Sequence, residues 1–391
     1  MKTLIELYDT RPLENILATE VFRPERTVFL VPAEIAESPS MKNRVRSYLN
    51  GREIETELSA VSVDVNSVES VHHALSEISE KWRGCALSIT GGSETSLFAA
   101  GLFAAGTDIP VFTWSRTRQR FFNVQNAPFA DVDTRFVRFS AADFLRMAGG
   151  NARQGRVDNQ VLSRYLWLIE PFSHVFLDRQ RTWVHTISWM QAASPSEKGK
   201  TPSLHVAAAP VLKVTRERVS PDPETLSALA AIGMISDLSI SEQEISFSFA
   251  DAQIRTWLRD NGSVLELLVY KACLDSGLFN EVQVSVIVDW APQKEIDGVS
   301  NEIDVVACRG IIPLFISCKT GDIKTEALNE LAILRDRFGG SMAQALIVSA
   351  EPVVNAQRNR AADLSIAVCD RDDLADGVLS QRIAEVMKLS F

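Results

Sequence analysis

The sequence predicts an α/β protein made of three successive units. Apolar strand patterns and helical patterns alternate along residues 1–145, as in a parallel sheet covered by helices. Residues 146–250 are less regular and read as a small α+β connector. Residues 251–391 follow the order helix, three strands, helix, two strands, which predicts a second α/β domain.

The first unit is read from short apolar runs separated by helical spacing. Residues 3–8 form the first expected strand, and Pro12 stands at a favoured first-turn position of the helix that follows. Ser67 is expected to cap the helix over 67–82. Further strands are expected at residues 27–32, 85–90, 110–115 and 120–125, and further helices at 12–22 and 96–106. This alternation predicts a Rossmann-like domain over residues 1–145.

The connector, residues 146–250, contains a loop and a helix followed by two strands. Pro, Ser, Lys and Gly crowd residues 194–203, which predicts the loop. Residues 220–250 read as a helix, capped by Ser220 or Asp222, and a hairpin, an order that resembles a small winged-helix unit. A DNA-reading role is an alternative here. The connector carries 11 basic against 10 acidic residues, so a strong basic face is not expected.

The last unit, residues 251–391, has a clear order of elements. Gly277 is expected to end its second helix in a C-cap role. Residues 301–319 read as a hairpin that turns near Arg309-Gly310. The helices are expected at 251–260, 263–277 and 322–340, and the remaining strands at 281–290, 343–350 and 364–369.

The bulk properties limit the class of protein. A formal net charge of −10 argues against a chain whose main task is to coat nucleic acid. The opening residues lack a signal-peptide cleavage pattern, and no apolar run reaches the roughly 18 residues that a membrane span needs. A cytoplasmic protein without a membrane partner is expected, and no histidine is expected to bind a metal.

Polar residues on the 301–319 hairpin form the main candidate site. Side chains alternate across a strand, and directly paired residues share a face. A turn at Arg309-Gly310 would set Glu302 roughly opposite Ser317. The residues expected together on one face are Glu302, Asp304, Ser317 and Lys319, beside Glu326 or Glu330 of the following helix.

This set of residue types suits metal-assisted hydrolysis of a phosphodiester. Carboxylates bind Mg²⁺ or Mn²⁺, and such an ion stabilises phosphate charge and helps to form hydroxide. Asp304 is the first expected ligand and Lys319 the positive partner. The alternative is a solvated surface ion pair between Asp304 and Lys319, worth about 0.2–1 kcal/mol.

Glu266, on the helix before the first strand of this unit, has two interpretations. It could project toward the same cleft as a metal ligand. Ser263-Val264-Leu265-Glu266 also matches a capping box, in which Glu266 would accept from the Ser263 amide. The sequence leaves both open.

At these residues the chain resembles the PD-(D/E)xK restriction-endonuclease superfamily. The matching elements are Asp304, a short hairpin and then Ser317-Cys318-Lys319, within the helix, three-strand, helix, strand order. The position two before the lysine, usually acidic in that superfamily, is Ser317 here. The resemblance implies that another acid replaces it, from Glu326, Glu302 or Glu266.

A second resemblance lies in the first unit. Residues 87–104 resemble the ligand motif of CARF domains, the Rossmann-like sensors of cyclic oligoadenylate. Thr90, Gly91, Gly92 and Ser93 match its turn from strand to helix, and Glu94 stands where the family often has lysine. Glycines allow close backbone approach, and a helix N-terminus offers amides to phosphate. Asp9, Thr10 and Asn15 would form the other wall.

Together the two resemblances match the ancillary nucleases of type III CRISPR antiviral defence. They imply a homodimer whose sensor domains bind cyclic oligoadenylate, with cyclic tetra-adenylate the form expected, and whose nuclease domains cleave DNA or RNA. The alternative is a non-catalytic sensor whose last domain only binds a partner or nucleic acid. Residues 251–391 carry 14 basic against 21 acidic residues, so substrate binding would depend on local positive sites such as Arg255, Arg259 and Lys271.

Overall fold

The computed structural model describes residues 1–195, 201–214, 217–290 and 300–388. It contains two six-stranded sheets, a three-stranded sheet and a two-stranded ribbon, with helices packed around them. The expected α/β class is confirmed. Much of the loop expected at 194–203 lies outside the described residues.

The N-terminal sheet has the strand order β3-β2-β1-β4-β5-β6. The strands from β3 to β5 are parallel, and β6 is antiparallel to β5. The order reverses between β1 and β4, the position where α/β sheets bind ligands beyond their strand ends. The strands are β1 (Thr3–Leu7), β2 (Arg26–Val31), β3 (Glu57–Ser62), β4 (Cys85–Ser88), β5 (Val111–Ser115) and β6 (Arg120–Gln125).

Local sequence explains where the helices of this domain begin. Ser67 accepts a hydrogen bond from the Ser70 amide and caps α4, as predicted. Ser93 caps α5 in the same way through the Ser96 amide. The helices are α1 (Leu17–Phe22), α2 (Ala33–Glu37), α3 (Pro39–Gly51), α4 (Val68–Lys81), α5 (Glu94–Ala105) and α6 (Ala141–Met147).

The middle unit packs helices against a small antiparallel sheet of order β11-β12-β8. Asp222, rather than Ser220, caps α9 by accepting from the Thr225 amide at 3.0 Å. The expected helix and hairpin are therefore α9, β11 and β12. The elements are α7 (Leu166–Asp178), α8 (Gln180–Ala193), α9 (Pro223–Ala231), α10 (Ala252–Trp257), β8 (His205–Ala208), β9 (Leu212–Val214), β10 (Glu217–Val219), β11 (Ile235–Ile240) and β12 (Ile245–Phe249).

The C-terminal sheet has the order β17-β16-β15-β14-β13-β7. Its first strand in the chain, β7, comes from the range expected as connector and pairs antiparallel with β13. The helices pack in two pairs, α11 with α14 and α12 with α13. The elements are β7 (Asn151–Gln154), β13 (Glu281–Asp289), β14 (Ser300–Arg309), β15 (Ile312–Lys319), β16 (Gln344–Ser349), β17 (Ala367–Cys369), α11 (Ser263–Asp275), α12 (Thr325–Leu334), α13 (Asn355–Asp363) and α14 (Val378–Lys388).

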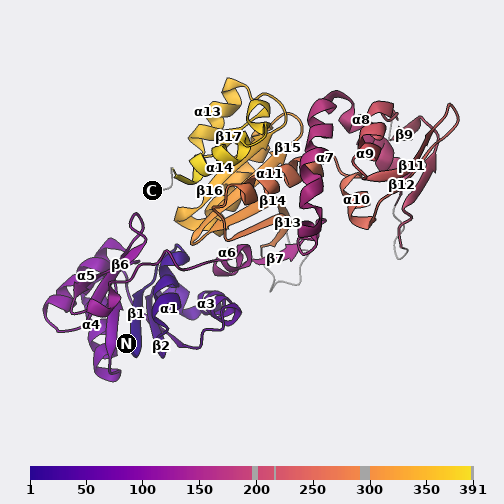
Figure 1. Ribbon diagram of the computed structural model, residues 1–391. Coiled ribbons are helices and arrows are strands. Elements are labelled where there is room, and N and C mark those ends of the chain that lie inside the picture. Colours follow the sequence, from indigo (N-terminus) through magenta and orange to yellow (C-terminus); the bar gives the residue numbers. More distant parts are fainter. Residues whose placement is uncertain (196–200, 215–216, 291–299, 389–391) are drawn as a thin grey trace.

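The three units lie in a row whose order differs from the order in the chain (Figure 1). The C-terminal sheet, orange to yellow, lies between the N-terminal domain and the middle unit. One apolar cluster runs from one face of the N-terminal sheet into the other two units, and a second fills the opposite face of that sheet. Within the described ranges, every helix is too short or too polar to cross a membrane.

The hairpin between β14 and β15 differs from its expected register. Arg309 pairs with Ile312, so the two loop residues are Gly310 and Ile311. Gly310 has φ +61°, a conformation that favours glycine at the first position of a two-residue loop. The expected pairing was therefore wrong by two residues, and a continuous register sets Ser317 opposite Asp304 instead of Glu302. A shift of two residues preserves the face on which each side chain lies.

Candidate functional site

Asp304 lies on β14 and is held by residues of the neighbouring strand β15. Its Oδ2 atom accepts hydrogen bonds from the Cys318 amide at 2.6 Å and from the Ser317 hydroxyl at 3.1 Å. The Lys319 ammonium lies 3.7 Å from the same oxygen. Ser317, where the superfamily usually has an acid, therefore acts as a hydrogen-bond donor that orients Asp304.

Glu302 lies on the same strand as Asp304 and is also held from a neighbouring strand. Its Oε1 atom accepts a hydrogen bond from the hydroxyl of Ser285 on β13. Ser285 has φ +57°, and its own carbonyl accepts from the Gly155 amide at 2.8 Å. A Cβ atom at Gly155 would lie 2.5 Å from that carbonyl, so only glycine fits there. This close contact fixes the position of the next residue, Arg156.

Arg156 is a site residue that the sequence did not reveal. Its guanidinium bonds the buried carboxylate of Glu266 and that of Asp260, the latter at 2.7 Å, and lies 3.8 Å from Glu302 Oε1. It stands in a polar tract more than a hundred residues before the acids it contacts. No motif or spacing in the sequence connects it with them. The extra strand β7 brings it to the site.

Glu266 does not form the expected capping box. The Ser263 amide donates to Asp260 Oδ1 at 2.9 Å, and Asp260 also accepts from the Ser263 hydroxyl. The Glu266 side chain bonds Arg156 instead. Its second oxygen, Oε2, is buried and has no hydrogen-bond partner among the described residues. This arrangement leaves one carboxylate oxygen available for a cation.

The electrostatics of the site indicate too little positive charge for its acids. Burial raises the pKa of Glu266 to about 8, against the opposing effect of Arg156 and with a further increase from Asp304. Burial also raises the pKa of Asp304, although Lys319 and the Cys318 amide oppose the shift. Crowded carboxylates in a water-poor site would be stabilised by a divalent cation.

One cavity joins the hairpin to α12. Glu302, Asp304, Ser317 and Lys319 all line it, so the expected shared face is confirmed. Glu330 of α12 lines the same cavity, and its carboxylate accepts from the Asn301 amide group. Glu326 is exposed in the first turn of α12 and is not among the residues that line the cavity.

The second candidate site lies at the carboxyl ends of β1 and β4, where the strand order reverses. The Gly92 amide donates to Asp9 Oδ2 at 3.2 Å and thereby joins the two strand ends. Gly92 has φ +106°, and a Cβ atom there would lie 2.8 Å from Leu7 Cβ. A Cβ atom at Gly91 would lie 2.8 Å from Asp9 Cβ. Both glycines are therefore required for the turn to close on β1.

The other residues expected at this site have distinct places around the turn. Asn15 exchanges hydrogen bonds with the Asp9 backbone, at 2.8 and 2.7 Å, and Thr90 accepts from the Trp114 amide. Ser93 caps α5, and Glu94 is exposed at its first position. Thr10 is exposed just beyond β1.

Two arginines that the sequence reading missed stand at the same edge. Arg11 pairs with Asp9 at 2.8 Å and with Glu14 at 3.4 Å. Arg116, just after β5, pairs with Glu14 at 2.9 Å. The two side chains are 42% and 40% exposed. The edge therefore presents cationic groups beside the amides of the glycine turn.

The three residues expected to offer positive charge to nucleic acid, Arg255, Arg259 and Lys271, are buried, half-buried or paired with an acid. Arg255 is buried and bonds the Ser194 carbonyl at 2.7 Å. Arg259 is half-buried, and Lys271 pairs with Asp275 at 2.6 Å. Another cavity, at the hairpin turn, has four arginines and no acid among its lining residues in the described ranges; these are Arg118, Arg135, Arg138 and Arg309.

Comparison with known proteins agrees with this geometry. Residues 254–388 match the family model of the Card1-like endonuclease domain. The crystal structure of VC1899 from Vibrio cholerae has a TM-score of 0.76 at 19% identity and covers 100% of this chain and 98% of its own. Can2 from Sulfobacillus thermosulfidooxidans, solved in complex with cyclic tetra-adenylate, has a TM-score of 0.71 at 18% identity, with 99% of each chain covered. No curated protein matches the sequence.

At these identities the two solved structures show a shared fold, and the family model matches the last domain. The match supports a nuclease-like domain at residues 254–388. Residues 254–388 are thus similar to a Card1-like endonuclease domain, within an α/β fold that the chain shares over nearly its full length with VC1899 and Can2.

Proposed function

We propose that this protein is a metal-dependent endonuclease that hydrolyses nucleic-acid phosphodiesters and is activated by a cyclic oligoadenylate. The observation that carries the proposal is the centre around Asp304, in which Lys319 stands beside a set of crowded carboxylates. An acid, a lysine and a nearby buried glutamate suit metal-assisted hydrolysis of a phosphodiester. The resemblance to type III CRISPR nucleases supports a role in antiviral defence.

The residues present fit a hard divalent cation. Asp304, Glu302 and Glu266 offer only oxygen donors, the ligands that Mg²⁺ and Mn²⁺ prefer. The buried Oε2 of Glu266 has no hydrogen-bond partner among the described residues, and a cation would satisfy it. When bound, such an ion would stabilise phosphate charge and lower the pKa of a water molecule.

The chain's own groups would prepare the site for that reaction. The Ser317 hydroxyl and the Cys318 amide fix the orientation of Asp304. Lys319, which is 35% exposed, can meet a phosphate oxygen and offset its developing negative charge. Arg156 fixes the Glu266 carboxylate and is a positioning residue.

The activator is proposed to bind at the edge between β1 and β4. The glycine turn offers backbone amides at the N-terminus of the 12-residue helix α5. Arg11 and Arg116 are paired with Asp9 and Glu14, and their part-exposed side chains would exchange these acids for ligand phosphates. The fold shared with Can2, which was solved with cyclic tetra-adenylate, supports that compound as the first to test.

Two cavities lie between the activator edge and the cleavage site. Thr10, Arg11 and Pro12 line one cavity together with Asp336, Arg337 and Gly340 of the C-terminal domain. The latter residues follow directly after α12, whose Glu330 and Leu334 line the cavity of Asp304. Movement of the β1 end can therefore reach α12, and we propose this route for activation.

A homodimer is proposed through α5. Phe98 and Leu102 are 62% and 48% exposed and stand four residues apart, so they share one face of this helix. Gly101, beside them, has open space around it. A second copy of the chain on this face would bury both side chains next to the glycine turn. This position fits a ligand pocket shared by two sensor domains.

The decisive experiment is cleavage of labelled single-stranded DNA, single-stranded RNA and supercoiled plasmid with Mn²⁺. Each substrate is tested with and without cyclic tetra-adenylate, for the natural sequence and for Asp304→Asn and Lys319→Gln. Cleavage should require both the metal and the activator and should fall at least about 100-fold in both variants. Exposed Lys324→Gln, in the same domain, is the control and should cleave normally.

Two results would contradict the proposal. Full cleavage by Asp304→Asn would show that the reaction occurs elsewhere. Activator binding without cleavage under any condition would favour a non-catalytic sensor, for which the hydrogen-bonding role of Ser317 in place of an acid is the supporting observation.

A further inference from the structure

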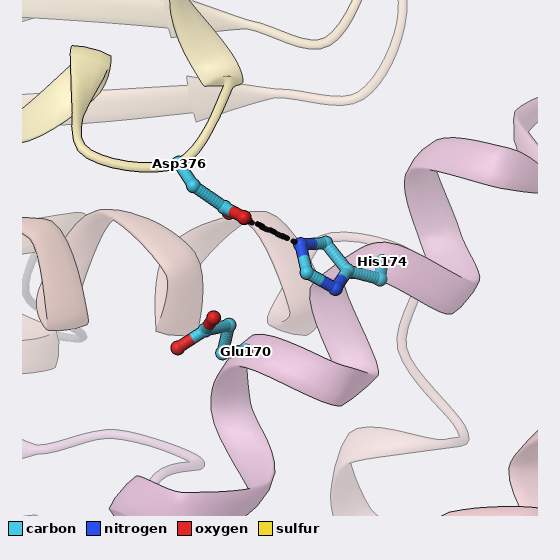
Figure 2. Close-up of side chains that lie close together, drawn as sticks. All are labelled: Glu170, His174 and Asp376. Atoms are coloured by element: carbon cyan, nitrogen blue, oxygen red, sulfur yellow. Dashed lines mark hydrogen bonds and ion pairs between the residues drawn. The ribbon is translucent and has the colours of Figure 1, made fainter.

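A second group of metal-ligating side chains lies outside the site already described. Glu170 and His174 come from α7, and Asp376 comes from the loop before α14 (Figure 2). The His174 Nε2 atom lies 3.0 Å from Asp376 Oδ1. One donor atom from each of the three residues lies within 4.8 Å of the other two. No metal was expected at a histidine from the sequence, although Glu170 stands four residues before His174.

The fold fixes the two segments that carry these residues. Glu170 and His174 are one helical turn apart, so their side chains share a face of α7. Helix α7 packs against α11, and α11 packs against α14, which follows Asp376. Gly377, with φ +74°, turns the chain directly after Asp376. The cluster therefore joins the middle unit to the C-terminal domain at a defined contact.

The donor set suits a transition metal and not the hard ion proposed for the cleavage site. Zinc binds imidazole nitrogen at about 2.0–2.1 Å and carboxylate oxygen at about 2.0–2.2 Å, so tetrahedral donors lie roughly 3.4 Å apart. His174 Nε2 and Asp376 Oδ1, 3.0 Å apart, are already close to this spacing. The donor atoms of the three residues lie within 4.8 Å of one another, and because the side chains are exposed, a change of rotamer can bring them closer. Imidazole suits zinc, copper and nickel, whereas Mg²⁺ selects oxygen.

The surrounding charges favour a cation. Glu170 and Asp376 line one cavity with Lys271 and Asp275. The Lys271 ammonium lies 2.6 Å from Asp275, which compensates its charge. The carboxylates of Glu170 and Asp376 thus exceed the local positive charge.

We propose that Glu170, His174 and Asp376 bind a divalent transition-metal ion such as Zn²⁺, with water completing the coordination. The ion would tie α7 to the loop before α14 and so restrain the middle unit against the C-terminal domain. This site does not depend on nuclease activity, because it lies on other elements and has a different donor chemistry.

The test is titration of the untagged full-length protein with Co²⁺, followed by visible absorption, and with Zn²⁺ in competition with a chromophoric chelator. Asp304→Asn serves as the background in which the oxygen-only site is impaired. One Co²⁺ ion per chain should bind with visible bands that Zn²⁺ removes. His174→Ala and Glu170→Gln should each weaken Zn²⁺ binding at least tenfold and abolish the rise in Tm that Zn²⁺ causes.

A matched control is His185→Ala, because His185 is an exposed histidine on the adjacent helix α8. This variant should bind Zn²⁺ and Co²⁺ as the natural sequence does. Unchanged Zn²⁺ affinity in His174→Ala would overturn the proposal. So would the lack of Co²⁺ bands in every folded protein, which would leave His174 and Asp376 as an ion pair alone.

Discussion

At the scale of single residues, the site is defined by charges that the protein alone does not fully compensate. Glu266 is only 2% exposed. Asp304 is partly buried, and its burial raises its pKa. Arg156 and Lys319 offset part of this charge. Buried acids of this kind are costly for folding and useful for binding a cation.

The first prediction concerns pH and the metal-free protein. The folded-state pKa of Glu266 is about 8, above the ordinary 4.5, so the folded state holds this proton more tightly than the unfolded chain. The stabilising contribution is complete below pH 4.5 and is lost as pH rises through 8, by at most roughly 1.4 kcal/mol per pH unit. Urea unfolding in EDTA from pH 5 to 8.5 measures it.

Glu266→Gln is the companion variant, because glutamine carries no titrating proton at this position. Its free energy of unfolding should change less between pH 5 and 8.5 than that of the natural sequence. Identical pH profiles for both proteins would show that Glu266 does not hold a proton in the folded state.

The second prediction separates two acids of α12. Glu330 lines the cavity of Asp304, whereas Glu326 does not. Glu330→Gln should therefore lower kcat at least about tenfold, since it alters charge beside the reacting groups. Glu326→Gln is the matched control, one turn away on the same helix, and its kcat should be unchanged. A loss confined to Glu326→Gln would show that the helix presents the other acid to the substrate.

At the scale of elements, the turn between β4 and α5 packs closely against the end of β1. Its glycines lie against Leu7 and Asp9 of the neighbouring strand end, with no room for a side chain. The same turn places the first amides of α5 at that edge. The glycines of the motif are needed because the turn lies too close to β1 for a side chain.

The third prediction tests this turn. Gly92→Ala combines a positive φ with a contact of 2.8 Å to Leu7 Cβ, so it should lower the free energy of unfolding by about 1–3 kcal/mol and weaken cyclic tetra-adenylate binding. Gly233→Ala has a similar φ of +78° but open space, and it is the control. It should lose about 1 kcal/mol and keep its affinity. Calorimetry and thermal unfolding measure both.

At the scale of the whole molecule, the C-terminal domain lies between its two neighbours and contacts both (Figure 1). The β14–β15 turn is held by the segment before α6, since the Phe139 amide donates to the Gly310 carbonyl at 3.0 Å. Asn280 bonds both segments. The N-terminal and C-terminal domains therefore meet through one main-chain hydrogen bond and the two bonds of the Asn280 side chain.

The fourth prediction concerns the dimer. Phe98→Glu places a charge on the exposed apolar face of α5 and should convert the dimer to a monomer in light scattering coupled to gel filtration. Phe136→Glu changes an equally exposed residue, also 62%, outside α5 and should leave the mass unchanged. A dimer that persists in Phe98→Glu would place the two-fold contact elsewhere.

The fifth prediction concerns how an acidic protein holds its substrate. Arg118 is exposed and lines the arginine cavity at the hairpin turn. Arg118→Glu should weaken binding to non-cleaved DNA and reduce the slope of log affinity against log salt concentration by about 1. Exposed Arg218→Glu in the middle unit is the control. Equal slopes for both variants would exclude this cavity from substrate binding.

The sequence by itself determined what depends on local pattern. Short apolar runs and alternation identified β1, β2, β4, β5 and β6 and the main strands of the last sheet, but not β3 or β7. Alternation also gave the shared face of Asp304, Ser317 and Lys319, because side-chain direction follows from the period of two. The glycine turn at residues 90–93 and the cap at Ser67 are likewise local chemistry.

Only the tertiary structure decided what depends on contacts between distant segments. Arg156 reaches Glu266 because β7 joins the sheet through β13, and Asp260 takes the amide that a capping box would have given to Glu266. The two-residue shift in hairpin register and the meeting of Glu170 with Asp376 are of the same kind. Long-range packing sets such contacts, and no spacing along the chain encodes them.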